Sequence, residues 1–197
     1  MYPLQVFNGD VPELNIGVWV MDKGPGLVDF MFYNQSTIKS SIASIYFDDD
    51  AALLSTVEAI VGAGTSFEGD ASPGNLPGGR TLWPAFIASE QFSFSALSPP
   101  PKNGINPGEE TVFRFGLSGS AGIDDVESAL GNGMLRIGVH VIALPDGSSV
   151  SAVNVPLPAT GFLFGFGTVL LRTFRRKTGN MVRPAKQVSY LGYGGKQ

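Results

Sequence analysis

The sequence contains no cysteine and only one histidine among its 197 residues. Without cysteine there is no disulfide and no thiolate metal site. A single histidine cannot supply the several nitrogen ligands of a catalytic zinc ion. Acidic residues are missing from the last part of the chain, since all 17 lie at or before Asp146. Because disulfides and thiolate metal sites are absent, the stability of the folded part must come from its apolar core, for which about 150 residues are sufficient.

Basic residues are distributed in the opposite way. Six precede Leu171, so that part of the chain has a net charge of −11, whereas the tail from Arg172 onward holds seven basic residues and no acidic one. An acidic body argues against nucleic acid as a partner, because nucleic acid is bound by basic surfaces. A change of sign beside an apolar run is typical of a segment that enters a membrane and is stopped by cytoplasmic basic residues.

Where the acidic body meets the basic tail, the stretch VPLPATGFLFGFGTVLLRTFRRK contains three segments in a fixed order. A proline-containing motif comes first and consists of Val155, Pro156, Leu157, Pro158, Ala159 and Thr160. An apolar segment follows and consists of Gly161, Phe162, Leu163, Phe164, Gly165, Phe166, Gly167, Thr168, Val169, Leu170 and Leu171. A basic cluster ends the stretch and consists of Arg172, Arg175, Arg176 and Lys177. This order predicts a sorting address, with a processing motif, a membrane segment and a stop-transfer cluster.

The apolar run is short for a permanent anchor. From Ala159 to Leu171 it has 13 residues. As a helix it would span roughly 20 Å, against the ~30 Å of a bilayer core. A transient anchor that is later cleaved tolerates this mismatch. The alternative is a buried strand or helix of the core, but the flanking motif and basic cluster favour a membrane-directed segment.

The three-part order resembles the C-terminal sorting signal of PEP-CTERM proteins, in the variant that reads VPLPA, here Val155–Ala159. The resemblance implies an exosortase-type membrane enzyme as partner and transient anchoring in the inner membrane. It also implies delivery to the cell surface or an exopolysaccharide matrix of a Gram-negative bacterium. Family signals end within a few residues of the basic cluster, whereas this chain continues from Thr178 to Gln197. We expect that extension to be basic and disordered.

The body carries the same resemblance. Four segments match a pattern common in PEP-CTERM ectodomains: DFMFYN at 29–34, SSIASIYFDD at 40–49, SPPPKNGINPGE at 98–109 and LRIGVHV at 135–141. The start, Met1–Asn8, has neither a basic region nor an apolar run, so it is not a signal peptide. Family ectodomains begin in a similar way just after their cleaved leader. We therefore expect an exported protein whose signal peptide is missing from this chain.

The same residues also fit a second sorting signal. Leu157–Gly161 reads LPATG, the LPxTG pattern of Gram-positive sortase substrates. Such a substrate would be cut between Thr160 and Gly161 and attached to the cell wall through the threonine. The segments of the body favour the exosortase interpretation, and the sortase interpretation stays open as an alternative.

Alternating apolar residues predict strands rather than helices for most of the body. In residues 14–21 the alternation places Leu14, Ile16, Val18 and Val20 on one face and Trp19 on the other. Further strands are expected over residues 27–33, 42–47, 92–94, 112–117 and 135–144, with 148–155 leading out of the domain. Two short helices are expected at 51–61 and 124–130, the second because acidic residues suit a helix N-terminus.

About seven short strands separated by Gly and Pro turns predict a mostly β fold, a single antiparallel β-sandwich. The domain boundaries follow from the charge and the motif. We expect a β-sandwich ectodomain at residues 1–152, the sorting signal at 153–177 and the extension at 178–197.

Asp48, Asp49 and Asp50 follow a predicted strand and are candidates for a calcium site. Carboxylates are ligands that Ca²⁺ prefers, but a calcium loop spaces them alternately, whereas three adjacent side chains diverge. An acidic turn that precedes a helix is therefore the preferred interpretation, and we expect no cofactor.

No residue set in the sequence indicates catalysis, so we expect no enzymatic activity. His140 is predicted to share a strand face with Arg136 and Gly138 and is interpreted as structural. No G-x-S-x-G nucleophile motif is present. Trp83 and Tyr46 are able to stack on sugar rings, although core packing is the preferred interpretation for both. A secreted carbohydrate-binding or carbohydrate-active domain is the alternative function for the body.

Overall fold

The computed structural model describes residues 1–154, so the predicted sorting motif, membrane segment, basic cluster and extension, all from Val155 onward, lie outside the described residues. The strands are β1 (Tyr2–Val6), β2 (Ile16–Asp22), β3 (Leu27–Asn34), β4 (Ser41–Asp49), β5 (Leu54–Val61), β6 (Phe67–Gly69), β7 (Ser93–Ala96), β8 (Glu110–Leu117), β9 (Leu135–Ile142) and β10 (Val150–Asn154). The helices are α1 (Pro100–Asn103), α2 (Ile123–Asn132) and the 3₁₀-helix η1 (Gly79–Thr81).

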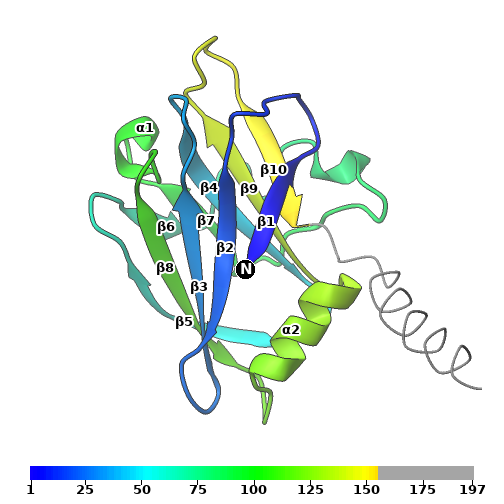
Figure 1. Cartoon of the computed structure of the whole chain (residues 1–197). Coiled ribbons are helices and arrows are strands. Elements are labelled where there is room, and N and C mark those ends of the chain that lie inside the picture. Colours follow the sequence, from blue (N-terminus) through cyan, green and yellow to red (C-terminus); the bar gives the residue numbers. More distant parts are fainter. Residues whose placement is uncertain (155–197) are drawn as a thin grey trace, which may run out of the picture. The chain divides into compact units, whose positions relative to one another are not determined.

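The described strands form one antiparallel sheet in the order β5-β8-β3-β2-β1-β10-β9-β4-β7-β6. Strand β1 joins two layers, because Tyr2 and Pro3 pair with β2 whereas Leu4, Gln5 and Val6 pair with β10. The sheet thereby folds over on itself, with β5, β8, β3 and β2 in one layer and β10, β9, β4 and β7 in the other (Figure 1). The predicted mostly β, antiparallel fold is confirmed, and the nearly closed sheet has the arrangement of a barrel or a sandwich.

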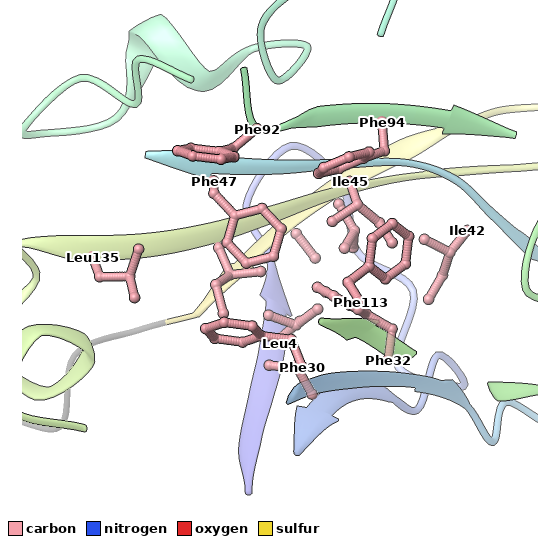
Figure 2. Packing of buried hydrophobic residues seen from close by; sticks show 14 of the residues in the cluster. Leu4, Phe30, Phe32, Ile42, Ile45, Phe47, Phe92, Phe94, Phe113 and Leu135 are labelled. Carbon is pink, nitrogen blue, oxygen red and sulfur yellow. The ribbon is translucent and has the colours of Figure 1, made fainter. Parts of the chain in front are cut away.

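Phenylalanine rings from both layers form the centre of the core. Phe47 of β4 packs edge-on against Phe30 and Phe32 of β3 and Phe115 of β8, with ring centroids 5.1, 6.0 and 4.9 Å away. Figure 2 shows Phe47 and Phe94 facing Phe30, Phe32 and Phe113 across the space between the layers. Such edge-to-face contacts add to the free energy gained by burial of the rings. In β9 the core face is the one that the alternation of apolar residues predicts, because the side chains of Ile137, Val139 and Val141 are fully buried.

The helix predicted at residues 51–61 is wrong. Residues 54–61 form strand β5, which pairs with β8 along the edge of the sheet. Its sequence LSTVEAIV is rich in β-branched residues, which lose side-chain freedom in a helix and pack well on a pleated sheet. The helix predicted at 124–130 is confirmed as α2, and the Asp125 carboxylate accepts a hydrogen bond from the Gly122 N–H at its start.

The segment expected to lead out of the domain is an interior strand. β10 lies between β1 and β9, and its residues Val150, Ser151, Ala152 and Asn154 are buried. It ends at Asn154, two residues after the predicted end of the ectodomain at residue 152. Within residues 1–154, no helix has the length and apolar character needed to cross a membrane.

Candidate functional site

Asp48 of β4 and Arg136 of β9 lie opposite each other on the outer face of their layer. Their neighbours Phe47 and Ile137 point into the core, so the period of two turns Asp48 and Arg136 away from it. Arg136 donates from Nη2 to Asp48 Oδ2, and the two side chains are only 10% and 3% exposed. Burial raises the pKa of Asp48, while the Ile87 N–H and the Arg136 charge oppose that rise.

The ion pair is buried because a long connection, here called the Trp83 loop (residues 70–92), covers it. The loop joins β6 to β7 and lies on the outer side of the layer that contains β9 and β10 (Figure 1). Leu76 and Phe86 of the loop pack on Tyr46 of β4 and form a second apolar cluster with Ala71. Tyr46 is fully buried and donates from its hydroxyl to the Pro73 carbonyl at 3.0 Å. Its predicted role in core packing is confirmed.

Hydrogen bonds to side chains hold the part of the loop that follows Trp83. Arg136 Nη1 donates to the Pro84 carbonyl at 2.8 Å, and Nη2 donates to the Ala85 carbonyl. Asp48 Oδ2 accepts from the Ile87 N–H at 2.9 Å. Within the loop, the Asn75 side chain donates from Nδ2 to the Phe86 carbonyl and accepts at Oδ1 from the Ala88 N–H. The backbone from Pro84 to Ala88 therefore has a fixed position on the sheet.

Trp83 itself is 98% exposed. The preferred interpretation of Trp83 as a core residue is therefore wrong. The second tryptophan, Trp19 of β2, is 42% exposed and lies on the outer face, as predicted. A tryptophan that is almost fully exposed on an anchored loop is unusual, because the indole ring normally contributes a large buried area.

A pocket of about 270 Å³ lies beside Trp83. Its wall is formed by loop residues, by the end of α2 and by the end of β10; the lining residues are Leu82, Trp83, Pro84, Phe86, Asn132, Gly133, Arg136, Val153 and Asn154. Arg136 and Asn154 contribute the buried polar side chains of this lining and are 8% and 2% exposed.

Each of these two side chains keeps one donor that no atom of the described chain accepts. Arg136 Nε and Asn154 Nδ2 are both buried without a hydrogen-bond partner within the described residues. The Asn154 Oδ1 atom, in contrast, accepts from the Ile137 N–H at 2.6 Å and thereby fixes the side chain. Buried donors are normally paired with protein or water, so these two donors, on side chains that line the pocket, are exceptions among the described residues.

The three aspartates predicted as weak calcium candidates do not converge. Asp48 is paired with Arg136, Asp49 Oδ2 accepts from the Leu54 N–H at 2.7 Å, and Asp50 is exposed in the turn. Only Asp50 lies in the predicted turn, because Asp48 and Asp49 end strand β4, and a strand follows the turn in place of the expected helix. In the described part of the chain, no three His, Cys, Asp or Glu residues lie close enough to hold a metal ion.

His140 lies in a row of hydroxyl side chains on the outer face, in the predicted company of Arg136 and Gly138. Its cross-strand partners are Ser44 and Ser151, and Nδ1 lies 3.3 Å from Ser151 Oγ. Burial lowers the pKa of His140, and the hydrogen bond to the Val150 backbone partly opposes this. Because Ser151 is fully buried, this Ser–His contact is part of the packing and offers no accessible nucleophile.

A larger depression of about 760 Å³ lies at the other end of α2, lined by the 22–26 turn and by residues 119–125. Asp22, Asp124 and Asp125 give it an acidic rim. Asp22 and Asp125 each accept from a backbone N–H of their own turn, at 2.8 and 2.9 Å. These carboxylates are therefore explained by turn and helix-cap geometry.

Comparisons of the chain with protein-family models, with curated proteins and with solved structures found no match. The pocket could not be predicted from the sequence, because the residues that line it come from three segments far apart in the chain. A large aromatic residue inside a Gly- and Pro-rich loop, as in residues 69–84, is the sequence signal that points toward it.

Proposed function

We propose that this chain is an exported surface or extracellular-matrix protein that is sorted by a C-terminal signal of the PEP-CTERM type. The folded body is the passenger, a β-sandwich ectodomain without catalytic activity. Residues 155–177 are the address, which an exosortase-type enzyme reads and processes at the inner membrane.

The observation that carries the proposal is the position of the motif in the sequence, directly after the last described strand. The described strands and the aromatic core lie within residues 1–154, and the proline-containing motif begins at Val155. Cleavage near Pro158 would therefore leave every described strand in place, including the interior strand β10. A processing enzyme needs an accessible backbone, so a motif that follows the last described strand suits the proposed cleavage better than one inside a strand.

Charge supports the same division. The described residues carry 17 acidic and six basic side chains, a net charge of −11, whereas the tail is basic. Arg175, Arg176 and Lys177 would remain on the cytoplasmic side and stop transfer, while the acidic body is exported. An acidic body is also unsuited to nucleic acid.

The decisive experiment is the intact mass of the surface-associated form, expressed in its native host together with its upstream DNA. A mature C-terminus near Pro158 is the expected result. A C-terminus at Thr160 would indicate a sortase and the LPxTG alternative. A chain that ends at Gln197 and is found in a soluble fraction would contradict both signals.

Paired variants test the basic cluster against a matched control. The double variant Arg175→Ser/Arg176→Ser should release unprocessed protein into the periplasm or the medium, because two of the four stop-transfer charges are lost. Arg183→Ser/Lys186→Ser removes the same number of positive charges outside the signal, so processing should not change. Equal processing of both double variants would rule out the stop-transfer role.

A further inference from the structure

We propose that the pocket beside Trp83 binds a neutral polysaccharide, with a sugar ring stacked on the Trp83 indole. The site belongs to the folded body and does not depend on the sorting signal. For the alternative function as a carbohydrate-binding domain, the pocket is the binding site and a neutral polysaccharide is the ligand.

The first argument is that the Trp83 loop presents an exposed ring on a backbone that is held in place. Its indole is 98% exposed, but the backbone that follows it is held by Arg136, Asp48 and Asn75. Because the backbone beside the ring is already held, binding costs little conformational entropy of the loop. An apolar ring face on such a platform is suited to the flat apolar face of a pyranose.

The second argument is the polar part of the lining. Arg136 Nε and Asn154 Nδ2 are buried donors without a partner within the described residues, and both side chains line the pocket. Both atoms have less than 1 Å² of accessible surface, so a sugar hydroxyl or ether oxygen would satisfy them only after a shift of the Arg136 or Asn154 side chain toward the ligand. A stacking surface beside hydrogen-bond donors matches the two kinds of surface that a sugar presents.

The third argument is charge. The Arg136 guanidinium is already neutralised by Asp48, so the pocket holds donors without a net positive charge. The described residues as a whole carry a net charge of −11. Phosphates, polyuronates and anionic lipids would be repelled by this field, whereas a neutral sugar is not affected.

The volume limits how much of the ligand is enclosed. At about 270 Å³ the pocket is slightly smaller than the roughly 300–1,000 Å³ of pockets that surround drug-sized ligands. We therefore infer that one ring of a longer chain occupies the pocket and that the rest of the polysaccharide lies along the surface.

The test uses the full chain with Trp19→Phe, so that the fluorescence comes from Trp83 alone. The probes are three neutral polymers, dextran, galactomannan and a mixed-linkage β-glucan, with alginate as the anionic comparison. The expected result is a saturable blue shift of the emission with at least one neutral polymer and none with alginate. No shift with any of the three neutral polymers, or a shift with alginate alone, would overturn the proposal.

Variants then locate the binding, measured in the natural background by affinity electrophoresis in the polymer that gave the shift. Trp83→Ala should weaken binding at least about tenfold, as the loss of a central aromatic contact does. Trp83→Phe should keep part of the affinity, because it retains a ring. The matched control Trp19→Ala removes the other exposed tryptophan and should leave binding unchanged.

Two other outcomes would also overturn the proposal. If Trp83→Ala binds like the natural chain, the polymer is bound elsewhere. If the Trp83 emission responds to phosphatidylcholine vesicles but to none of the neutral polymers, the exposed ring contacts a lipid surface.

Discussion

Gly138 of β9 lies so close to Leu76 of the Trp83 loop that a Cβ atom on the glycine would be 2.7 Å from Leu76 Cδ2. The same Cβ would also be 3.1 Å from Phe86 Cζ. The absence of a side chain at Gly138 therefore lets the Trp83 loop lie flat on the outer face of the sheet. The position of the Trp83 platform depends on a glycine in a strand that is otherwise regular.

Gly138→Ala should lower the free energy of unfolding by about 1–3 kcal/mol, the usual effect of overpacking a tight contact. The extra methyl group pushes Leu76 and Phe86 away from the sheet and loosens the Trp83 loop. Urea unfolding of the full chain measures the loss. The control is Gly131→Ala in α2, where an added Cβ meets nothing within 4 Å. That control should stabilise by about 0.5–1 kcal/mol, and equal effects at the two sites would contradict the packing argument.

The two ion pairs of the described residues should differ strongly in their effect on stability. Arg136→Met leaves the Asp48 carboxylate buried without its partner and should cost about 3–5 kcal/mol. Arg114→Met breaks the pair with Asp29, in which the arginine side chain is 32% exposed, and should cost clearly less. Urea unfolding of both variants gives the comparison.

A double variant separates lost attraction from buried charge. Asp48→Asn/Arg136→Met removes both charges and should recover part of the stability that Arg136→Met loses, because no uncompensated carboxylate remains. A double variant that is less stable than Arg136→Met would contradict this argument, because asparagine keeps an oxygen that accepts from the Ile87 N–H.

Much of the sheet was predictable because its signals are local. In residues 135–141 a period of two separates Ile137, Val139 and Val141 from Arg136, Gly138 and His140, and the structure has these faces. A strand that buries one face carries apolar residues at every second position, so this alternation can be read from the sequence. The start of α2 was predictable for the same reason, since its acidic first turn is a local signal.

The candidate site was not predictable because it is made by contacts distant in sequence. Asp48 and Arg136 are 88 positions apart, and the loop that buries them shows no periodicity. Trp83 was assigned to the core because large aromatic residues are usually buried. The helix prediction for residues 51–61 fails because β8 offers this segment a strand partner, and tertiary pairing outweighs weak local preference.

The centre of the aromatic core should be the most sensitive part of the fold. Phe47 is fully buried and contacts Phe30, Phe32, Phe94 and Phe115. Phe47→Ala should therefore cost about 3–5 kcal/mol, from lost burial and from the cavity that remains. The control Phe67→Ala removes a partly buried ring whose aromatic contact is with Phe113, and the loss should be smaller. Equal losses by urea unfolding would contradict the assignment of Phe47 to the core centre.

The stability of the protein should fall as the pH is lowered through the range in which histidine titrates. Burial lowers the pKa of His140 in the folded state below the ordinary value of 6.5. As the pH falls through that value, the unfolded chain binds a proton before the folded chain does, so the unfolded state is favoured. The contribution is fully present above the unfolded pKa and is lost by the time the pH is below the folded pKa.

His140→Gln tests this dependence because it removes the titrating group and keeps a polar side chain beside Ser44 and Ser151. Urea unfolding of both proteins between pH 7.5 and pH 5 should show a smaller decline for the variant. Since no other histidine is present, the difference between the two curves isolates this residue. Parallel curves would mean that His140 has the same pKa in the folded and unfolded states, and that solvent reaches its ring despite the neighbouring strands.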